Sequence, residues 1–120
     1  MPDINITTIK HEHQRYETVG DWQIGAFENI NIKVSNMNNP TYEFLVGIHE
    51  LIEAMLCKQY GITEEVVDSW DMDHLDSNDP GSIPGCPYYR QHFLATIIER
   101  MLADELEVDW DLYEEAIESL

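Results

Sequence analysis

Three ionisable side chains interrupt an apolar stretch that runs from residue 44 to residue 56. They are His49, Glu50 and Glu53, and their neighbours are Leu, Ile, Val, Met, Phe, Ala and Gly. An apolar run with helical spacing predicts an interior helix, in which these three groups lose part of their contact with water. Because a carboxylate is rarely buried without a cation, a metal ion or a hydrogen-bond donor, each of these groups needs a partner.

The spacing of these residues suits a metal ion. On a helix, His49 and Glu53 lie one turn apart on one face, and Glu50 lies one step round the same side. A histidine nitrogen and a carboxylate oxygen can bind one divalent ion, while Glu50 takes a proton from a water that the ion has acidified. The completing metal ligands are predicted to be His92 and Glu99, which share one face of a second apolar helix. We therefore expect a divalent metal cofactor, zinc or manganese before magnesium, with Glu50 as the catalytic base.

The segment resembles the active-site helix of the zincin metallopeptidases, whose pattern is His-Glu-x-x-His among uncharged residues. His49 stands at the position of the first zinc ligand, Glu50 at that of the general base, and Glu53 where the family has its second histidine. The resemblance implies a small metal-dependent hydrolase, in its finer form a degenerate zincin-like peptidase that acts on a peptide or a small molecule. The carboxylate of Glu53 in place of an imidazole favours harder metals such as manganese or magnesium. The stretches around His49 and from residue 84 to residue 92 also resemble small phage-type proteins, which implies no particular activity.

A second resemblance points to different chemistry. Glu50-Leu-Ile-Glu53, followed by Glu65-Val-Val-Asp68, resembles the E-x-x-E and E-x-x-D pairs of the all-α nucleotide pyrophosphohydrolases. That resemblance implies a magnesium ion held by carboxylates between two helices and a polyphosphate substrate. It requires Asp68 to lie near Glu50 and Glu53, and it leaves His49 without a role.

A buried structural network is the alternative to a metal site. His49 and Glu53 could hydrogen-bond to each other, with an arginine neutralising Glu50 or Glu53. The protein would then be a non-enzymatic, acidic binding or inhibitor protein. The two hypotheses differ in whether His92 or an arginine lies beside Glu53. The candidate arginines are Arg15, Arg90 and Arg100.

The overall charge limits the possible partners. The chain has a formal net charge of -18 at pH 7, and its acidic residues are concentrated in its second half. Such a field repels phosphate backbones, so no nucleic-acid partner is expected, whereas a basic protein partner is compatible with it. No apolar run reaches the roughly 18 residues needed to span a bilayer, and the N-terminal residues do not resemble a signal peptide. We therefore expect a cytoplasmic protein without a membrane partner.

A small sheet and two long helices are predicted to position the site. Residues 3–9, 21–27 and 29–35 alternate or are rich in β-branched residues and predict three strands, the last two as a hairpin. Pro40 and Thr41 open a helix over residues 41–60, which Gly61 ends.

Three more helices are predicted, over residues 63–70, over residues 87–106, and from a cap at Asp109 to the end of the chain. A chain of 120 residues is expected to form a single domain, residues 1–120. The predicted class is α+β: a small three-stranded, mainly antiparallel sheet followed by about four helices, with helix 41–60 central and packed on helix 87–106.

Overall fold

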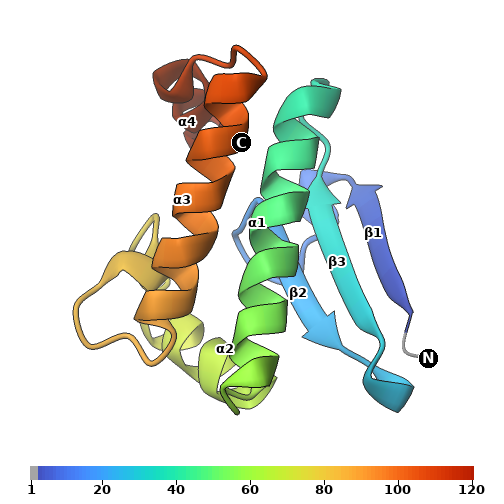
Figure 1. The fold of residues 1–120 in the computed structure, drawn as a ribbon, viewed down its shortest axis with the longest axis vertical. Helices are drawn as coiled ribbons and strands as arrows, with labels where there is room; N and C mark the ends of the chain where they lie inside the picture. The colour runs from blue at the N-terminus through green and yellow to red at the C-terminus, as the bar shows by residue number, and fades with distance from the viewer. Residues whose placement is uncertain (1–2) are drawn as a thin grey trace.

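The computed structural model describes residues 3–120 and combines a three-stranded sheet with four α-helices, which confirms the predicted α+β class (Figure 1). The strands are β1 (Ile4–Ile9), β2 (Gly20–Ile24) and β3 (Ile30–Ser35). The α-helices are α1 (Pro40–Gln59), α2 (Glu64–Asp73), α3 (Tyr89–Glu105) and α4 (Trp110–Glu118). Short 3-10 turns lie at η1 (His11–His13), η2 (Ala26–Glu28) and η3 (Pro80–Ser82).

The sheet is mixed, so the prediction of a mainly antiparallel sheet was wrong. β2 and β3 form the expected antiparallel hairpin, but β1 pairs in parallel with the other edge of β3, which gives the order β1-β3-β2. β3 lies at the centre, and its alternate residues Ile30, Ile32 and Val34 are all buried. Alternation reveals which face of a strand is buried, whereas the direction of its neighbour depends on the path of residues 10–19.

The helices begin and end close to the predicted residues because their caps are local. Thr63 accepts a hydrogen bond from the amide of Val66, and Asp109 accepts one from the amide of Leu112, as N-cap residues do. α1 begins one residue earlier than predicted, where the Asn39 side chain accepts from the Tyr42 amide. Gly61 follows α1 with a φ of +71°, a conformation that glycine adopts at low cost.

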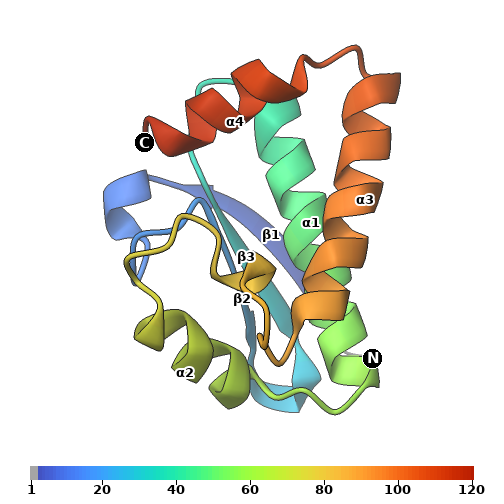
Figure 2. The same ribbon diagram turned by 90° about the vertical axis from the view of Figure 1, so that its left-hand side faces the viewer.

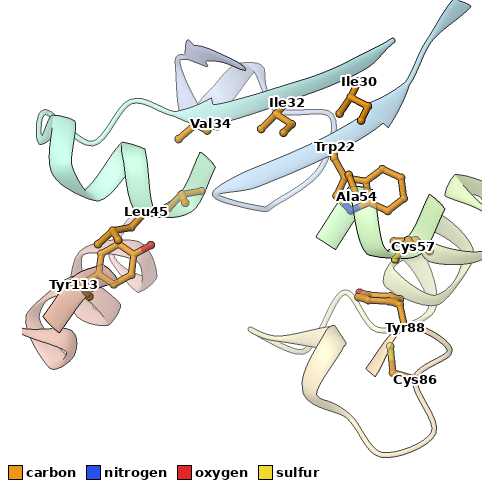
Figure 3. Packing of buried hydrophobic residues seen from close by; sticks show 13 residues of the cluster. Trp22, Ile30, Ile32, Val34, Leu45, Ala54, Cys57, Cys86, Tyr88 and Tyr113 are labelled. Atoms are coloured by element: carbon orange, nitrogen blue, oxygen red, sulfur yellow. The ribbon is translucent and has the colours of Figure 1, made fainter. Parts of the chain in front are cut away.

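The core lies between the sheet and α1 and extends to α3 and α4. Figure 3 shows Trp22 of β2 beside Ala54 of α1, and Tyr113 of α4 beside Leu45 of α1. α3 packs along α1, as predicted, and the two helices run side by side in Figure 1. The pairing of α1 with α3 is the contact that brings the two halves of the candidate site together.

Three other segments surround that contact. Figure 2 shows α4 above, α2 below, and the connection from α2 to α3, with η3, lying between them. Within residues 3–120, no helix has both the length and the apolar sequence that crossing a bilayer would require.

Candidate metal centre

Two helices supply three side chains whose inner atoms converge. α1 carries His49 and Glu53 one turn apart, and α3 carries His92 on its facing side. These side chains are 12%, 7% and 15% exposed, so all three are largely removed from water. Together they form a group that could hold a metal ion.

The three inner atoms form a nearly equilateral triangle. His49 Nε2 lies 3.1 Å from Glu53 Oε2, His92 Nδ1 lies 2.8 Å from the same oxygen, and the two nitrogens are 3.2 Å apart. Two ligands bound at about 2.1 Å to one ion lie about 3.0 Å apart at a right angle and about 3.4 Å apart at the tetrahedral angle. The triangle therefore has the size of one face of a metal coordination sphere.

The outer nitrogen of each histidine is held by a carboxylate. His49 Nδ1 lies 2.7 Å from Glu99 Oε1, and His92 Nε2 lies 2.9 Å from Asp79 Oδ1. A proton on each outer nitrogen leaves the inner nitrogen with a free lone pair, which is the state that binds a metal. Carboxylate partners of this kind are the usual support of metal-binding histidines.

Two further hydrogen bonds tie the site to the rest of the fold. The hydroxyl of Tyr113 on α4 donates to Glu99 Oε2 at 2.6 Å. The indole of Trp22 on β2 donates to Glu53 Oε1 at 3.1 Å. One oxygen of Glu53 therefore accepts a hydrogen bond from the sheet, and the other faces the two imidazoles.

The η3 segment packs directly on His92. A Cβ atom at Gly81 would lie only 2.5 Å from Cγ of His92, so residue 81 has no room for a side chain while the imidazole keeps this position. The indole of Trp70 donates to the carbonyl of Pro80 at 2.9 Å, which fixes η3 against α2. The ring of His92 is thus positioned by both α3 and this connection.

Histidines rather than an arginine face the carboxylates of the site. Burial disfavours a charged His49, but Glu53 and Glu99 outweigh this and raise its pKa well above the ordinary value. Burial likewise opposes charging His92, yet Asp79 and Glu53 raise its pKa to about 9. Although burial acts in the other direction, hydrogen bonds from the two histidines lower the pKa of Glu53 to about 2. The carboxylates around the two imidazoles therefore favour positive charge at the triangle, which either protons or a divalent ion can supply.

Glu50 lies beside the triangle, and no salt bridge joins it to another residue of the range 3–120. Its side chain packs against β2, where a Cβ atom at Gly20 would approach Glu50 Cγ to 2.7 Å. Burial and the neighbouring charge of Glu53 raise the pKa of Glu50 to about 8. Glu50, His49, Glu53 and His92 all line one cavity of about 550 Å³.

The predicted site residues are brought together, but they take three different positions. His49, Glu53 and His92 form the triangle, and Glu50 borders the same cavity. Glu99 lies outside the triangle, on the outer nitrogen of His49. The sequence reasoning missed the supporting roles of Asp79, Trp22 and Tyr113, since no local spacing connects them to α1.

The arginines proposed for a structural network lie elsewhere. Arg15 donates to both oxygens of Asp21 and to both oxygens of Asp68, at 2.6 to 2.9 Å. Arg100 lies over the ring of Trp110, 4.8 Å from its centre, and Arg90 is exposed. His92, rather than an arginine, is the residue beside Glu53. The carboxylate of Asp68, which a pyrophosphohydrolase site would need, is committed to Arg15.

Comparisons with models of known protein families, with curated proteins and with solved structures find no match to this chain.

Proposed function

We propose that the protein is a small metal-dependent hydrolase whose ion is bound by His49, Glu53 and His92. The observation that carries the proposal is the orientation of the two imidazoles: each turns one nitrogen to Glu53 Oε2 and the other to a separate carboxylate. Two histidines and one carboxylate form the ligand set of many catalytic zinc sites, which keep a further position for water or substrate. Zinc and manganese are the metals that we expect first, and iron(II) also binds this ligand set.

In this proposal Glu50 is the general base. A divalent ion at the triangle would polarise both a water molecule and the carbonyl group of the substrate. Glu50 takes a proton from that water, and the water oxygen adds to the carbonyl carbon. The C–N bond then breaks, and the proton passes from Glu50 to the leaving nitrogen, so that the products are a carboxylic acid and an amine. Positive charge at the triangle would also favour the ionised form of Glu50, in which it can accept a proton.

The likeness to zincins supports peptide bonds as the bonds that are cleaved. His49 and Glu50 occupy the positions of the first ligand and the base in that pattern, while Glu53 replaces the second histidine. His92 on the neighbouring helix restores a set of two histidines and one carboxylate. The proposed enzyme is therefore a degenerate zincin-like peptidase in which the ligand types have exchanged positions.

Metal analysis of the purified protein tests the proposal. The protein is stripped with a chelator, offered zinc, manganese, magnesium and iron(II) in turn under anaerobic conditions, and titrated calorimetrically. We expect one ion per chain, at least a hundredfold weaker binding in His49→Ala and in His92→Ala, and unchanged binding in His13→Ala, which removes an exposed histidine outside the triangle.

Hydrolysis is then assayed with a mixed peptide library, read out by mass spectrometry. Glu50→Gln should keep the ion and lose the cleavage products, because the amide cannot accept the proton from water. Absence of bound metal in all four titrations would overturn the proposal and favour the acidic binding protein. That alternative requires partner binding that weakens steeply with salt and survives His49→Ala.

A further inference from the structure

The walls of the site cavity are strongly acidic. Arg100 is the one lysine or arginine among the cavity-lining residues that the structure describes, and its guanidinium rests on Trp110. Several lining carboxylates are already neutralised: Arg15 binds Asp21 and Asp68, and the two imidazoles of the site bind the acids around them. Five lining carboxylates have no cationic partner among residues 3–120: Glu50, Glu64, Asp71, Glu114 and Glu118.

Loading the site with metal leaves this imbalance in place. A divalent ion at the triangle would face Glu53 directly, and Glu99 and Asp79 through the two imidazoles, so these three carboxylates already match its charge. The five remaining carboxylates lie outside this group, and walls of low dielectric focus the field of those that are ionised into the cavity. This field would repel an anionic substrate and attract a cationic one.

Asp71 places one of these carboxylates in the cavity wall. It is half-buried on α2 and accepts hydrogen bonds from the hydroxyls of Tyr88 and Tyr16. Burial, partly offset by the bond from Tyr88, raises its pKa to about 6, so it is charged at pH 7. Its hydrogen-bond donors are neutral, so its charge is available to a ligand. The rings of Tyr16, Tyr88, Trp22 and Trp110 also line the cavity, and aromatic faces favour cations.

From this charge pattern we propose that the substrate carries an ammonium or guanidinium group close to the bond that is cleaved, as a basic peptide does. The inference rests on the proposed metal-dependent hydrolysis and specifies its substrate class. Phosphorylated and polyphosphate substrates are excluded by the same charges. Asp71 and Glu50 border the space in which the cation would lie.

Amino-acid hydroxamates test the inference without knowledge of the natural substrate. Their hydroxamate group chelates the metal, and their side chains then extend into the cavity. The probes are lysine, norleucine and glutamate hydroxamates, which differ in side-chain charge at similar length. Binding is followed on the cobalt(II)-loaded protein by the change in its visible absorption spectrum.

We expect lysine hydroxamate to bind at least tenfold more tightly than norleucine hydroxamate, and glutamate hydroxamate to bind most weakly. This order should weaken between 20 mM and 500 mM salt. Asp71→Asn should reduce the preference for lysine several-fold, while Asp73→Asn should not change it. Asp73 is the matched control because it lies exposed on the same helix and does not line the cavity.

The outcomes separate this inference from the proposal on which it rests. A protein that binds no cobalt, zinc, manganese or iron overturns both. A protein that binds the ion but shows equal or reversed affinity for the three hydroxamates overturns the substrate class alone. A preference for lysine that persists unchanged in Asp71→Asn and at high salt would show that the cavity charges are not its source.

Discussion

At the scale of single residues, the site depends on how the ring of His92 is held. The imidazole extends from α3 and packs against Gly81, and its outer nitrogen contacts Asp79. Room for the ring exists because residue 81 has no Cβ atom. A side chain there would turn the ring and move Nδ1 away from Glu53.

Gly81→Ala should therefore weaken metal binding by about tenfold or more, the effect typical of a lost supporting contact. Calorimetric titration with zinc measures this change. Gly47→Ala is the matched control, since a Cβ there would meet Ile6 and Val34 of the sheet rather than a site residue. Equal affinities in the wild type and Gly81→Ala would contradict the role assigned to η3.

Asp71 provides a prediction on pH dependence. Its pKa of about 6 in the folded protein exceeds the ordinary value of 3.8 because the carboxyl is half-buried. The folded state then binds a proton more tightly than the unfolded state, so the contribution of Asp71 to stability falls as the pH rises from about 4 to about 6. Asparagine does not ionise, so Asp71→Asn should avoid this loss of stability.

We expect Asp71→Asn to be more stable than the wild type at pH 7, by about 1 kcal/mol after allowance for partial exposure of the side chain, and to gain nothing at pH 4. Urea unfolding at the two pH values measures the difference. A variant that is destabilised equally at both would show that the hydrogen bonds from the tyrosines matter more than the buried charge.

At the scale of elements, α4 is connected to the site by one side chain. Tyr113 is fully buried and donates to Glu99, which in turn holds His49 on α1. This chain of hydrogen bonds crosses three helices. Although no metal ligand was predicted on α4, this helix is therefore part of the site.

Tyr113→Phe should lower the affinity for zinc about tenfold, because Glu99 loses one of its two partners and holds His49 less firmly. The fold should survive, with a loss of about 1 to 3 kcal/mol for the unsatisfied carboxylate oxygen. Tyr42→Phe is the control: its ring packs on Tyr113 at 5.1 Å, but no hydrogen bond to another described residue involves its hydroxyl. Similar zinc affinity in both variants would leave Tyr113 with a packing role only.

The connection from β1 to β2 is anchored to α2 by Arg15. Its guanidinium binds Asp21, which is 5% exposed, and Asp68 on α2. Lysine cannot reproduce these paired bonds, so Arg15→Lys should cost about 2 kcal/mol of unfolding free energy. Lys58→Gln, which removes a 3.5 Å pair with the exposed Glu28, should cost less than about 0.5 kcal/mol. Chemical denaturation of both variants tests the comparison, and equal losses would contradict it.

At the scale of the whole molecule, the net charge of -18 opposes compactness. Six lysines and arginines cannot neutralise 24 acidic residues, so like charges repel one another over the surface. Salt screens this repulsion within a Debye length of about 10 Å at 0.1 M. The folded state should therefore gain stability from salt.

Thermal unfolding should accordingly shift upward by several degrees between about 10 mM and 500 mM sodium chloride. Differential scanning calorimetry in the presence of chelator measures the shift without a contribution from bound metal. A melting temperature that falls with salt would mean that the ion pairs of Arg15 and the histidines outweigh the surface repulsion.

Much of the helical framework follows from local rules that the sequence displays. Thr63, Asp109 and Gly61 mark helix ends because caps act within a single turn. His49 and Glu53 share a face because helical spacing permits nothing else. The buried face of β3 could likewise be read from the alternation of Ile30, Ile32 and Val34.

Other features depend on contacts between distant residues, and only the tertiary structure decided them. The parallel pairing of β1 with β3 depends on the path of a connection whose sequence has no clear period. Glu99 became a support and His92 a corner of the triangle because the register of α3 against α1 sets which residue reaches Glu53. Asp79 lies 26 residues from Glu53, Trp22 lies 27 residues from His49, and Tyr113 lies 60 residues from Glu53, so local spacing cannot reveal these partners.

The sequence by itself therefore determined that His49, Glu50 and Glu53 require partners, since an apolar helix cannot solvate them. The tertiary structure decided that the partners of His49 and Glu53 are histidine and carboxylate rather than arginine. The physical reason is one of range: desolvation is dictated by the neighbours of a residue along its own helix, whereas neutralisation is supplied by whichever side chains the packing of other elements brings near.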